Sequence, residues 1–178
     1  KWQSHQLELK NVPVVLNTTV TKEFLDDLDV DTVICAVGSN PITPNQFGIP
    51  GDNYVLGTDL FEDHVTLGKK VVIMGGGLVG CETALHLAET GHEVTVIEMA
   101  NEIAIETTAA HRRALKVRMG LYPEEAGQQY VKSDIIPPVL ATSTRCKEIT
   151  AEGVIAVTPD GEEKLFPADT VICALGLR

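Results

Sequence analysis

Short apolar runs recur along the chain, and their spacing predicts strands that alternate with helices. The run at residues 71–74 is apolar and mostly β-branched, which is typical of a parallel strand buried on both faces. Apolar residues then recur at helical spacing from Cys81 to Ala88, and Gly91 is suited to end that helix. A second strand follows at residues 94–98. Together these segments predict one strand–helix–strand unit.

The rest of the chain shows weaker patterns. Turn residues predict a linker over residues 39–53, and polar residues predict an irregular connection over residues 120–138. The remaining predicted elements are short helices at 1–11 and 58–63, a strand at 12–16, a helix from 109 capped by Thr107 or Thr108, a strand at 139–142, and an antiparallel hairpin at 149–166 that turns at 159–162.

One octet occurs twice. Residues 31–38 and residues 169–176 match at seven of eight positions, and each predicts a strand that ends in a glycine turn. Internal similarity of this kind indicates one supersecondary unit used twice. Only thirty residues precede the first copy, so we expect that its half-domain has lost its beginning and that the chain is a piece of a larger protein. The alternative is that residues 1–64 form a self-sufficient appendage.

A glycine-rich loop joins the strand at 71–74 to its helix. Gly75, Gly77 and Gly80 form the pattern G-x-G-x-x-G, which is a weak signal by itself and a stronger one between a strand and a helix. The first glycine permits a tight turn, the second lets a diphosphate approach the backbone, and the third lets the helix pack close to the strand. The start of the helix supplies free N–H groups and a partial positive charge, so no lysine is required.

Glu98 ends the second strand roughly 20 residues after the glycine loop, where such folds place an acid that holds the adenosine ribose. Its carboxylate would accept hydrogen bonds from the ribose hydroxyls and repel a 2′-phosphate. Residues 99–101 offer no arginine, so NAD is favoured over NADP. The alternative is a vestigial fold that binds no dinucleotide.

Composition narrows the class of protein. The net charge of −11 and the low aromatic content of 4% argue against a nucleic-acid partner. The four cysteines show neither C-x-x-C nor metal-ligand spacing, and Cys35 and Cys173 fall in apolar runs where we expect buried, inert thiols. No apolar run approaches the roughly 18 residues that span a bilayer. We therefore expect a cytoplasmic protein without a membrane partner.

These features resemble the middle portion of the two-dinucleotide-binding flavoproteins, the pyridine nucleotide-disulphide oxidoreductase superfamily. Residues 75–85 are most similar to the NADH:flavin oxidoreductases related to 2,4-dienoyl-CoA reductase, enoate reductase and trimethylamine dehydrogenase. The resemblance implies an α/β, Rossmann-like FAD/NAD(P)-binding fold with a central parallel sheet, helices and a small antiparallel β-meander. It also implies that residues 65–178 are an NAD(H)-binding domain and residues 1–64 a remnant of an FAD-binding domain with its linker.

The resemblance further implies which residues bind cofactors. The glycine loop would hold the NAD diphosphate and Glu98 the ribose. Glu82 would lie near the nicotinamide or flavin edge, or would merely complement the helix dipole. Residues 174–176 would pass beside the nicotinamide and residues 36–38 beside FAD. The candidates are Gly75, Gly76, Gly77, Leu78, Val79, Gly80, Glu82, Glu98, Ala174, Leu175, Gly176, Ala36, Val37 and Gly38.

The expected function is therefore that of an NADH-binding domain that presents nicotinamide to FAD. No residue is assigned as catalytic or metal-binding. The partners implied are NADH and the FAD-binding and barrel portions of the same protein. In relatives the barrel carries FMN and an iron–sulphur cluster. A homo-oligomer stays open. One alternative is a non-catalytic nucleotide-binding or scaffold module. Another is an NADH oxidase or disulphide reductase, although no paired cysteines support the latter.

Overall fold

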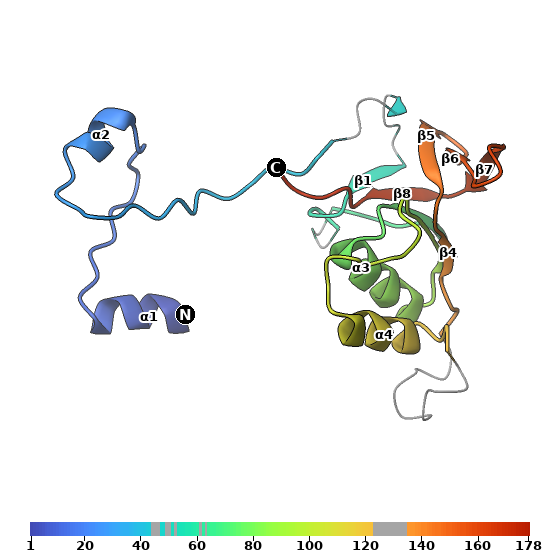
Figure 1. Ribbon diagram of the computed structural model, residues 1–178, viewed down its shortest axis with the longest axis horizontal. Coiled ribbons are helices and arrows are strands. Elements are labelled where there is room, and N and C mark those ends of the chain that lie inside the picture. The colour runs from blue at the N-terminus through green and yellow to red at the C-terminus, as the bar shows by residue number, and fades with distance from the viewer. Residues whose placement is uncertain (44–46, 49–50, 52, 61, 63, 123–134) are drawn as a thin grey trace. The chain divides into compact units, whose positions relative to one another are not determined.

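A computed structural model of the protein describes residues 1–43, 47–48, 51, 53–60, 62, 64–122 and 135–178 (Figure 1). It divides the chain into two compact units, residues 1–38 and residues 39–178. Parts of three predicted segments lie outside the described residues: the linker at 39–53, the helix at 58–63 and the connection at 120–138. The described residues of the predicted helix at 58–63 form turns instead of a helix.

The first unit contains two short helices, α1 (Trp2–Leu9) and α2 (Lys22–Asp26), and none of its residues is buried. The helix predicted at residues 1–11 is confirmed. The strands predicted at residues 12–16 and 31–38 are wrong, because a strand requires a neighbour for its N–H and C=O groups and the described residues of this unit provide none. For the same reason Cys35 is exposed rather than buried.

The second unit is built on a five-stranded, all-parallel sheet, which contains the strands predicted at residues 71–74, 94–98, 139–142 and within 169–176. Its strand order is β1-β8-β2-β3-β4, and every neighbouring pair is parallel. The sequence did not predict β1, a strand of three residues that adds to the edge beside β8. The strands are β1 (Tyr54–Leu56), β2 (Lys70–Met74), β3 (Glu93–Ile97), β4 (Val139–Ala141) and β8 (Thr170–Cys173).

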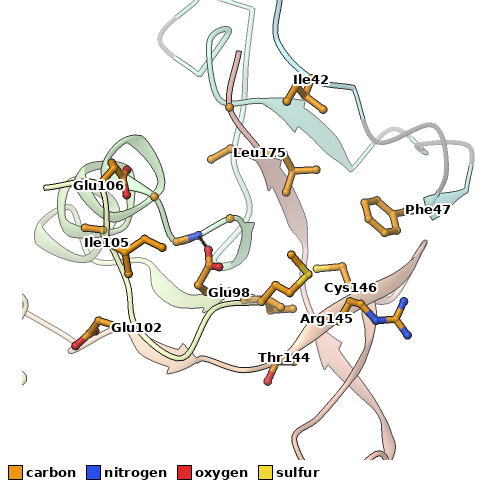
Figure 2. A pocket seen from close by; sticks show the side chains of 18 residues that line it. Ile42, Phe47, Glu98, Glu102, Ile105, Glu106, Thr144, Arg145, Cys146 and Leu175 are labelled. Atoms are coloured by element: carbon orange, nitrogen blue, oxygen red, sulfur yellow. Dashed lines mark hydrogen bonds between the residues drawn. The ribbon is translucent and has the colours of Figure 1, made fainter. Parts of the chain in front are cut away.

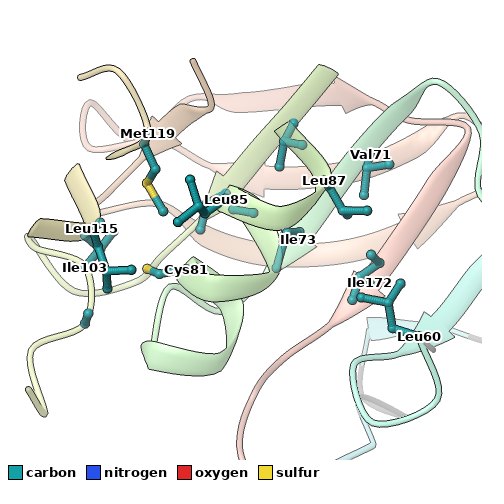
Figure 3. Packing of buried hydrophobic residues seen from close by; sticks show 14 residues of the cluster. Leu60, Val71, Ile73, Cys81, Leu85, Leu87, Ile103, Leu115, Met119 and Ile172 are labelled. Atoms are coloured by element: carbon teal, nitrogen blue, oxygen red, sulfur yellow. The ribbon is translucent and has the colours of Figure 1, made fainter. Parts of the chain in front are cut away.

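Two helices, α3 (Leu78–Glu89) and α4 (Ala109–Arg118), cover one face of this sheet (Figure 1). Val71 and Ile73 of β2 point toward them and join Leu85 of α3 in a buried cluster (Figure 3). Because successive side chains of a strand face opposite ways, Val72 and Met74 pack on the other side. The near-continuous apolar character of β2 follows from this burial on both faces.

The other face of the parallel sheet is covered by a three-stranded antiparallel sheet. Its strands are β5 (Arg145–Thr150), β6 (Gly153–Val157) and β7 (Glu163–Pro167), in that spatial order. Val154 and Phe166 pack against Val72 and Met74. The predicted hairpin is thus confirmed, and so is the fold class: α/β and Rossmann-like, with a central parallel sheet and a small antiparallel sheet.

Helix α4 begins as the sequence predicts. Of the two predicted caps, Thr108 is the one used, and its hydroxyl accepts a hydrogen bond from His111 N–H at 3.3 Å. Lys116 and Arg118 pair with Glu102 and Glu89, as basic residues of a solvated helix face often do. No helix in the described part of the chain is long and apolar enough to cross a membrane.

Candidate functional site

A cavity of about 670 Å³ lies at the carboxyl ends of the parallel strands in the second unit. Open α/β sheets bind their ligands at this edge. Seven of the residues predicted from the sequence line it: Gly75, Gly76, Gly77, Glu98, Ala174, Leu175 and Gly176. The fold therefore brings the glycine loop, the acid after β3 and the segment after β8 to one place (Figure 2).

Two glycines of the loop are required by close backbone approaches. Gly75 has φ +103°, and a Cβ on it would lie 2.5 Å from the carbonyl oxygen of Ala174. A Cβ on Gly80 would lie 2.0 Å from the carbonyl oxygen of Gly75. The first approach fixes the turn against the end of β8, and the second sets α3 directly against the strand that precedes it.

Gly77 stands at the N-terminus of α3 and has a different neighbour. A Cβ there would meet no backbone, only the carboxylate of Glu106 at 3.0 Å. The first backbone hydrogen bond of the helix runs from Cys81 N–H to the Gly77 carbonyl at 2.9 Å, so the N–H groups of residues 78–80 precede the helical ladder. One of them, Leu78 N–H, donates to the Glu106 carboxylate. An open backbone with free donors suits a diphosphate.

Glu98 is held by backbone donors. Its Oε2 accepts a 2.7 Å hydrogen bond from Gly76 N–H, drawn as a dashed line in Figure 2, and its Oε1 accepts one of 2.6 Å from Ala100 N–H. A carboxylate offers about four acceptor positions, so about two remain for hydroxyl groups of a ligand. Because the side chain is fixed in place, those positions have a defined direction.

The charges around the cavity are mostly negative. Glu98, Glu102 and Glu106 line it, and Arg145 is the cation among the described lining residues. Lys116 donates a 2.8 Å hydrogen bond to Glu102, which lowers the pKa of that carboxyl. An anionic ligand would therefore be held by backbone N–H groups rather than by basic side chains.

The buried thiols near the site are not nucleophiles. Burial raises the pKa of Cys81 to about 12, and the negative charges of Glu106 and Glu98 add to the effect. This outweighs the position of Cys81 in the first turn of α3, where a helix N-terminus ordinarily lowers a thiol pKa. Burial likewise raises the pKa of Cys146, which lines the cavity, to about 12. Both thiols stay protonated at neutral pH.

The other predicted residues lie elsewhere. Leu78, Val79, Gly80 and Glu82 belong to the first turns of α3 and are not among the lining residues, and Glu82 is exposed. Residues 36–38 belong to the first unit, are exposed, and form no strand there. The described residues of that unit thus form no cradle that fits FAD.

Several lining residues were not singled out from the sequence. Four of them follow β3: Met99, Glu102, Ile105 and Glu106. Their position after the carboxyl end of a predicted parallel strand could have identified them as candidates, because ligands bind at that end. Five more reach the cavity because the antiparallel sheet, the residue before it and the start of the second unit fold onto it, which no local pattern reveals. These are Thr144, Arg145, Cys146, Ile42 and Phe47.

Two protein-family models match the chain. The model for pyridine nucleotide-disulphide oxidoreductases matches residues 2–120. A model for NAD(P)-binding proteins matches residues 65–176, which include the glycine loop, Glu98 and the segment after β8. Both matches thus include the glycine loop.

Individual relatives match almost the whole chain. It is 34% identical to an NADH oxidase of Thermoanaerobacter brockii over 98% of its length and 32% identical to a cinnamate reductase of Clostridium sporogenes over 99%. A solved 2-naphthoyl-CoA reductase, in complex with 2-naphthoyl-CoA, is similar over 99% of the chain with a TM-score of 0.71 and 26% identity. The chain covers 25%, 24% and 24% of these proteins, about a quarter of their length.

Proposed function

Because this chain belongs to the pyridine nucleotide-disulphide oxidoreductase family, we propose that it is the NADH-binding part of a flavin-dependent oxidoreductase. Proteins of this family use FAD and NAD(P)H. Residues 65–178 are the proposed NAD(H)-binding domain, and residues 1–64 are the proposed remnant of an FAD-binding domain with its linker. The relatives' much greater length supports the view that the FAD-binding and barrel portions belong to a longer protein.

The observation that carries this proposal is the arrangement of Glu98 against the glycine loop. Glu98 is anchored by Gly76 N–H while the start of α3 presents backbone donors beside Gly77, which has no Cβ. In the proposal the diphosphate lies against those donors and the adenosine ribose against Glu98. NADPH would bring its 2′-phosphate up to a fixed carboxylate, so NADH is the favoured nucleotide.

When bound, NADH supplies a hydride, for which flavin is the acceptor in such flavoproteins. The chain's own part is to bind, orient and exclude water. Ala174 N–H donates to the Met74 carbonyl at 2.8 Å, which holds the segment at 174–176 in the wall opposite Glu98. Leu175 and Ile42 add apolar surface to that wall (Figure 2). Residues 174–176 are proposed to pass beside the nicotinamide, Glu82 to lie near its edge or that of the flavin, and residues 36–38 to face FAD in the complete protein.

The branch of the family is also a proposal. Similarity to a cinnamate reductase and to a 2-naphthoyl-CoA reductase supports the NADH:flavin oxidoreductases related to 2,4-dienoyl-CoA reductase. Similarity to an NADH oxidase supports the alternative of an oxidase-type flavoenzyme. Because similar segments serve these differently named enzymes, the choice of electron acceptor is proposed to lie outside this chain.

Calorimetric titration with NADH and with NADPH tests the proposal. NADH is expected to bind at least tenfold more tightly, since burying a charge beside a like charge is costly. Tighter binding of NADPH would contradict the role of Glu98. Replacement of Glu98 by Ala should remove the preference between the two nucleotides.

One observation favours a second candidate, a non-catalytic module with a vestigial nucleotide site. The Glu106 carboxylate already accepts the hydrogen bond of Leu78 N–H, in the position proposed for the diphosphate. If the site is vestigial, neither nucleotide will bind at millimolar concentration. Saturable NADH binding would exclude a vestigial site.

A further inference from the structure

The carboxylate of Glu106 takes the position of an anion at the start of α3. It accepts a hydrogen bond from Leu78 N–H, and its Oε1 lies 3.0 Å from the place that a Cβ on Gly77 would occupy. A negative group is favourable here because of the helix dipole and the free N–H groups. The structure therefore shows an internal anion where the proposed function places the diphosphate.

The loop that carries Glu106 is fixed in place by contacts on both sides of this residue. Ile103 is fully buried in the core, and Ala104 N–H donates to the Gly76 carbonyl at 2.7 Å, so the loop after β3 is fixed to the glycine loop. Ala104 then adopts φ +46°, a left-handed conformation that is uncommon for a residue with a side chain. This turn precedes Glu106 by two residues, before Thr108 caps α4. The path of the loop is thus set on both sides of Glu106.

The Glu106 side chain can nevertheless turn away from Leu78 N–H. Its side chain is exposed, and Leu78 N–H is the hydrogen-bond donor that the described residues give it. Glu102, on the same loop, differs: Lys116 donates a 2.8 Å hydrogen bond to it and Ile103 N–H another of 2.8 Å. An exposed carboxylate returns to water at little cost, whereas Glu102 would lose an ion pair.

We propose that the Glu106 carboxylate is an internal competitor that occupies Leu78 N–H in place of the dinucleotide diphosphate. The carboxylate must leave Leu78 N–H before the nucleotide can bind. The inference rests on the proposed function and deepens it. Glu106 occupies the Leu78 N–H donor while the site is empty and moves into solvent when the diphosphate enters. It thereby weakens nucleotide affinity and favours nucleotide release.

The test compares three variants by calorimetric titration with NADH. Glu106→Ala removes the competing carboxylate, and Glu106→Asp keeps the charge but shortens its reach by one methylene. Each should lower the Kd for NADH by roughly two- to fivefold, the effect of one acidic side chain at a helix N-terminus. Glu102→Ala removes the same charge from the same cavity without touching Leu78, so it measures the general effect of lost negative charge and should lower the Kd by less than Glu106→Ala does.

A second readout follows the proposed contact itself, first without nucleotide and then with NADH bound. The backbone amide resonance of Leu78 should shift in Glu106→Ala relative to the wild type and stay in place in Glu102→Ala. In the wild type, NADH should displace Glu106, so the Leu78 resonance of the complex should become the same in the wild type and in Glu106→Ala.

The outcomes separate the two proposals. If the wild type binds NADH and Glu106→Ala binds no more tightly, or Glu102→Ala gains as much, the internal competitor is contradicted and the proposed function stands. An unshifted Leu78 resonance in Glu106→Ala also contradicts the competitor. If neither the wild type nor any variant binds NADH, the proposed function is contradicted and the inference falls with it.

Discussion

Glu98 accepts a 2.7 Å hydrogen bond from the backbone N–H of Gly76, which joins the end of β3 to the loop that follows β2. A ligand held by that loop therefore meets a carboxylate whose direction is already set. Neighbouring strands bring the two residues together, because β2 and β3 pair in parallel and end at the same level, with Met74 opposite Ile97. Such preorganisation reduces the entropy lost on binding.

Replacing Glu98 by Ala should weaken NADH binding by roughly tenfold or more, because hydrogen bonds to a charged acceptor contribute about 1.5–3 kcal/mol. NADPH binding should change less or improve, since the repelling carboxylate is gone. Fluorescence titration of both nucleotides measures the change. Glu93→Ala, at the opposite end of β3, is the matched control and should leave both affinities unchanged. Equal losses for the two nucleotides would contradict a specific contact with the ribose.

Gly80→Ala and Gly77→Ala should separate stability from binding. The new Cβ on Gly80 would lie 2.0 Å from the Gly75 carbonyl, so α3 must shift, at a cost of about 1–3 kcal/mol in the free energy of unfolding. The new Cβ on Gly77 meets only a flexible side chain, so stability should fall by about 1 kcal/mol or less as an N-cap change, while NADH binding is lost. Chemical denaturation and nucleotide titration distinguish the two. A Gly77→Ala protein that still binds NADH normally would place the diphosphate elsewhere.

Thr108→Ala should destabilise the chain by about 1 kcal/mol, because it removes the hydroxyl that accepts His111 N–H at the start of α4. Thr108→Ser keeps the hydroxyl and should restore most of the loss. Urea denaturation measures both variants. Equal stability of the Ala and Ser variants would show that the cap contributes nothing.

The ion pair of Glu102 with Lys116 should make a small part of the stability depend on pH. The pKa of Glu102 lies below its usual value of 4.5 because Lys116 donates to it. A lowered folded-state pKa gives stability that is present above the unfolded value and is lost as the pH falls through the folded value. Glu102→Gln should therefore cost up to about 1 kcal/mol at pH 7 and less than that near pH 3. Denaturation curves at both pH values test this, and an undiminished difference at low pH would contradict it.

Thiol reactivity should differ between the cysteines. Cys35 is exposed and should react with a disulphide reagent at pH 8 in the native chain. Cys81 and Cys146, with pKa values raised to about 12 by burial, should react only after unfolding. Cys35→Ser should remove the fast phase and nothing else. A fast phase that survives in Cys35→Ser would show that a buried thiol is reachable.

The repeated octet shows what a local pattern can predict and what it cannot. Residues 169–176 contain β8, which pairs with β1 and β2 and is buried, whereas the nearly identical residues 31–38 form no strand and are exposed. Strand formation depends on neighbours and burial more than on intrinsic preference, so the same residues adopt different states. The prediction of a strand at residues 12–16 is wrong for the same reason.

The sequence predicted those parts of the site whose residues belong to one local unit of the chain. The glycine loop and Glu98 are fixed by a single strand–helix–strand unit, so their meeting could be read from spacing alone. Glu106 could not be, because its contact with Leu78 depends on the buried Ile103 and on the left-handed turn at Ala104. Arg145 and Cys146 reach the cavity from the antiparallel sheet, whose packing on β2 and β3 is a tertiary property.

A crystal structure of the protein with bound NADH tests the central proposal most directly. The diphosphate oxygens are expected within hydrogen-bond distance of the N–H groups of Leu78 and Val79, with a ribose hydroxyl on Glu98 and the Glu106 carboxylate turned into solvent. A diphosphate bound away from the start of α3, or a ribose that does not touch Glu98, would contradict the proposed function.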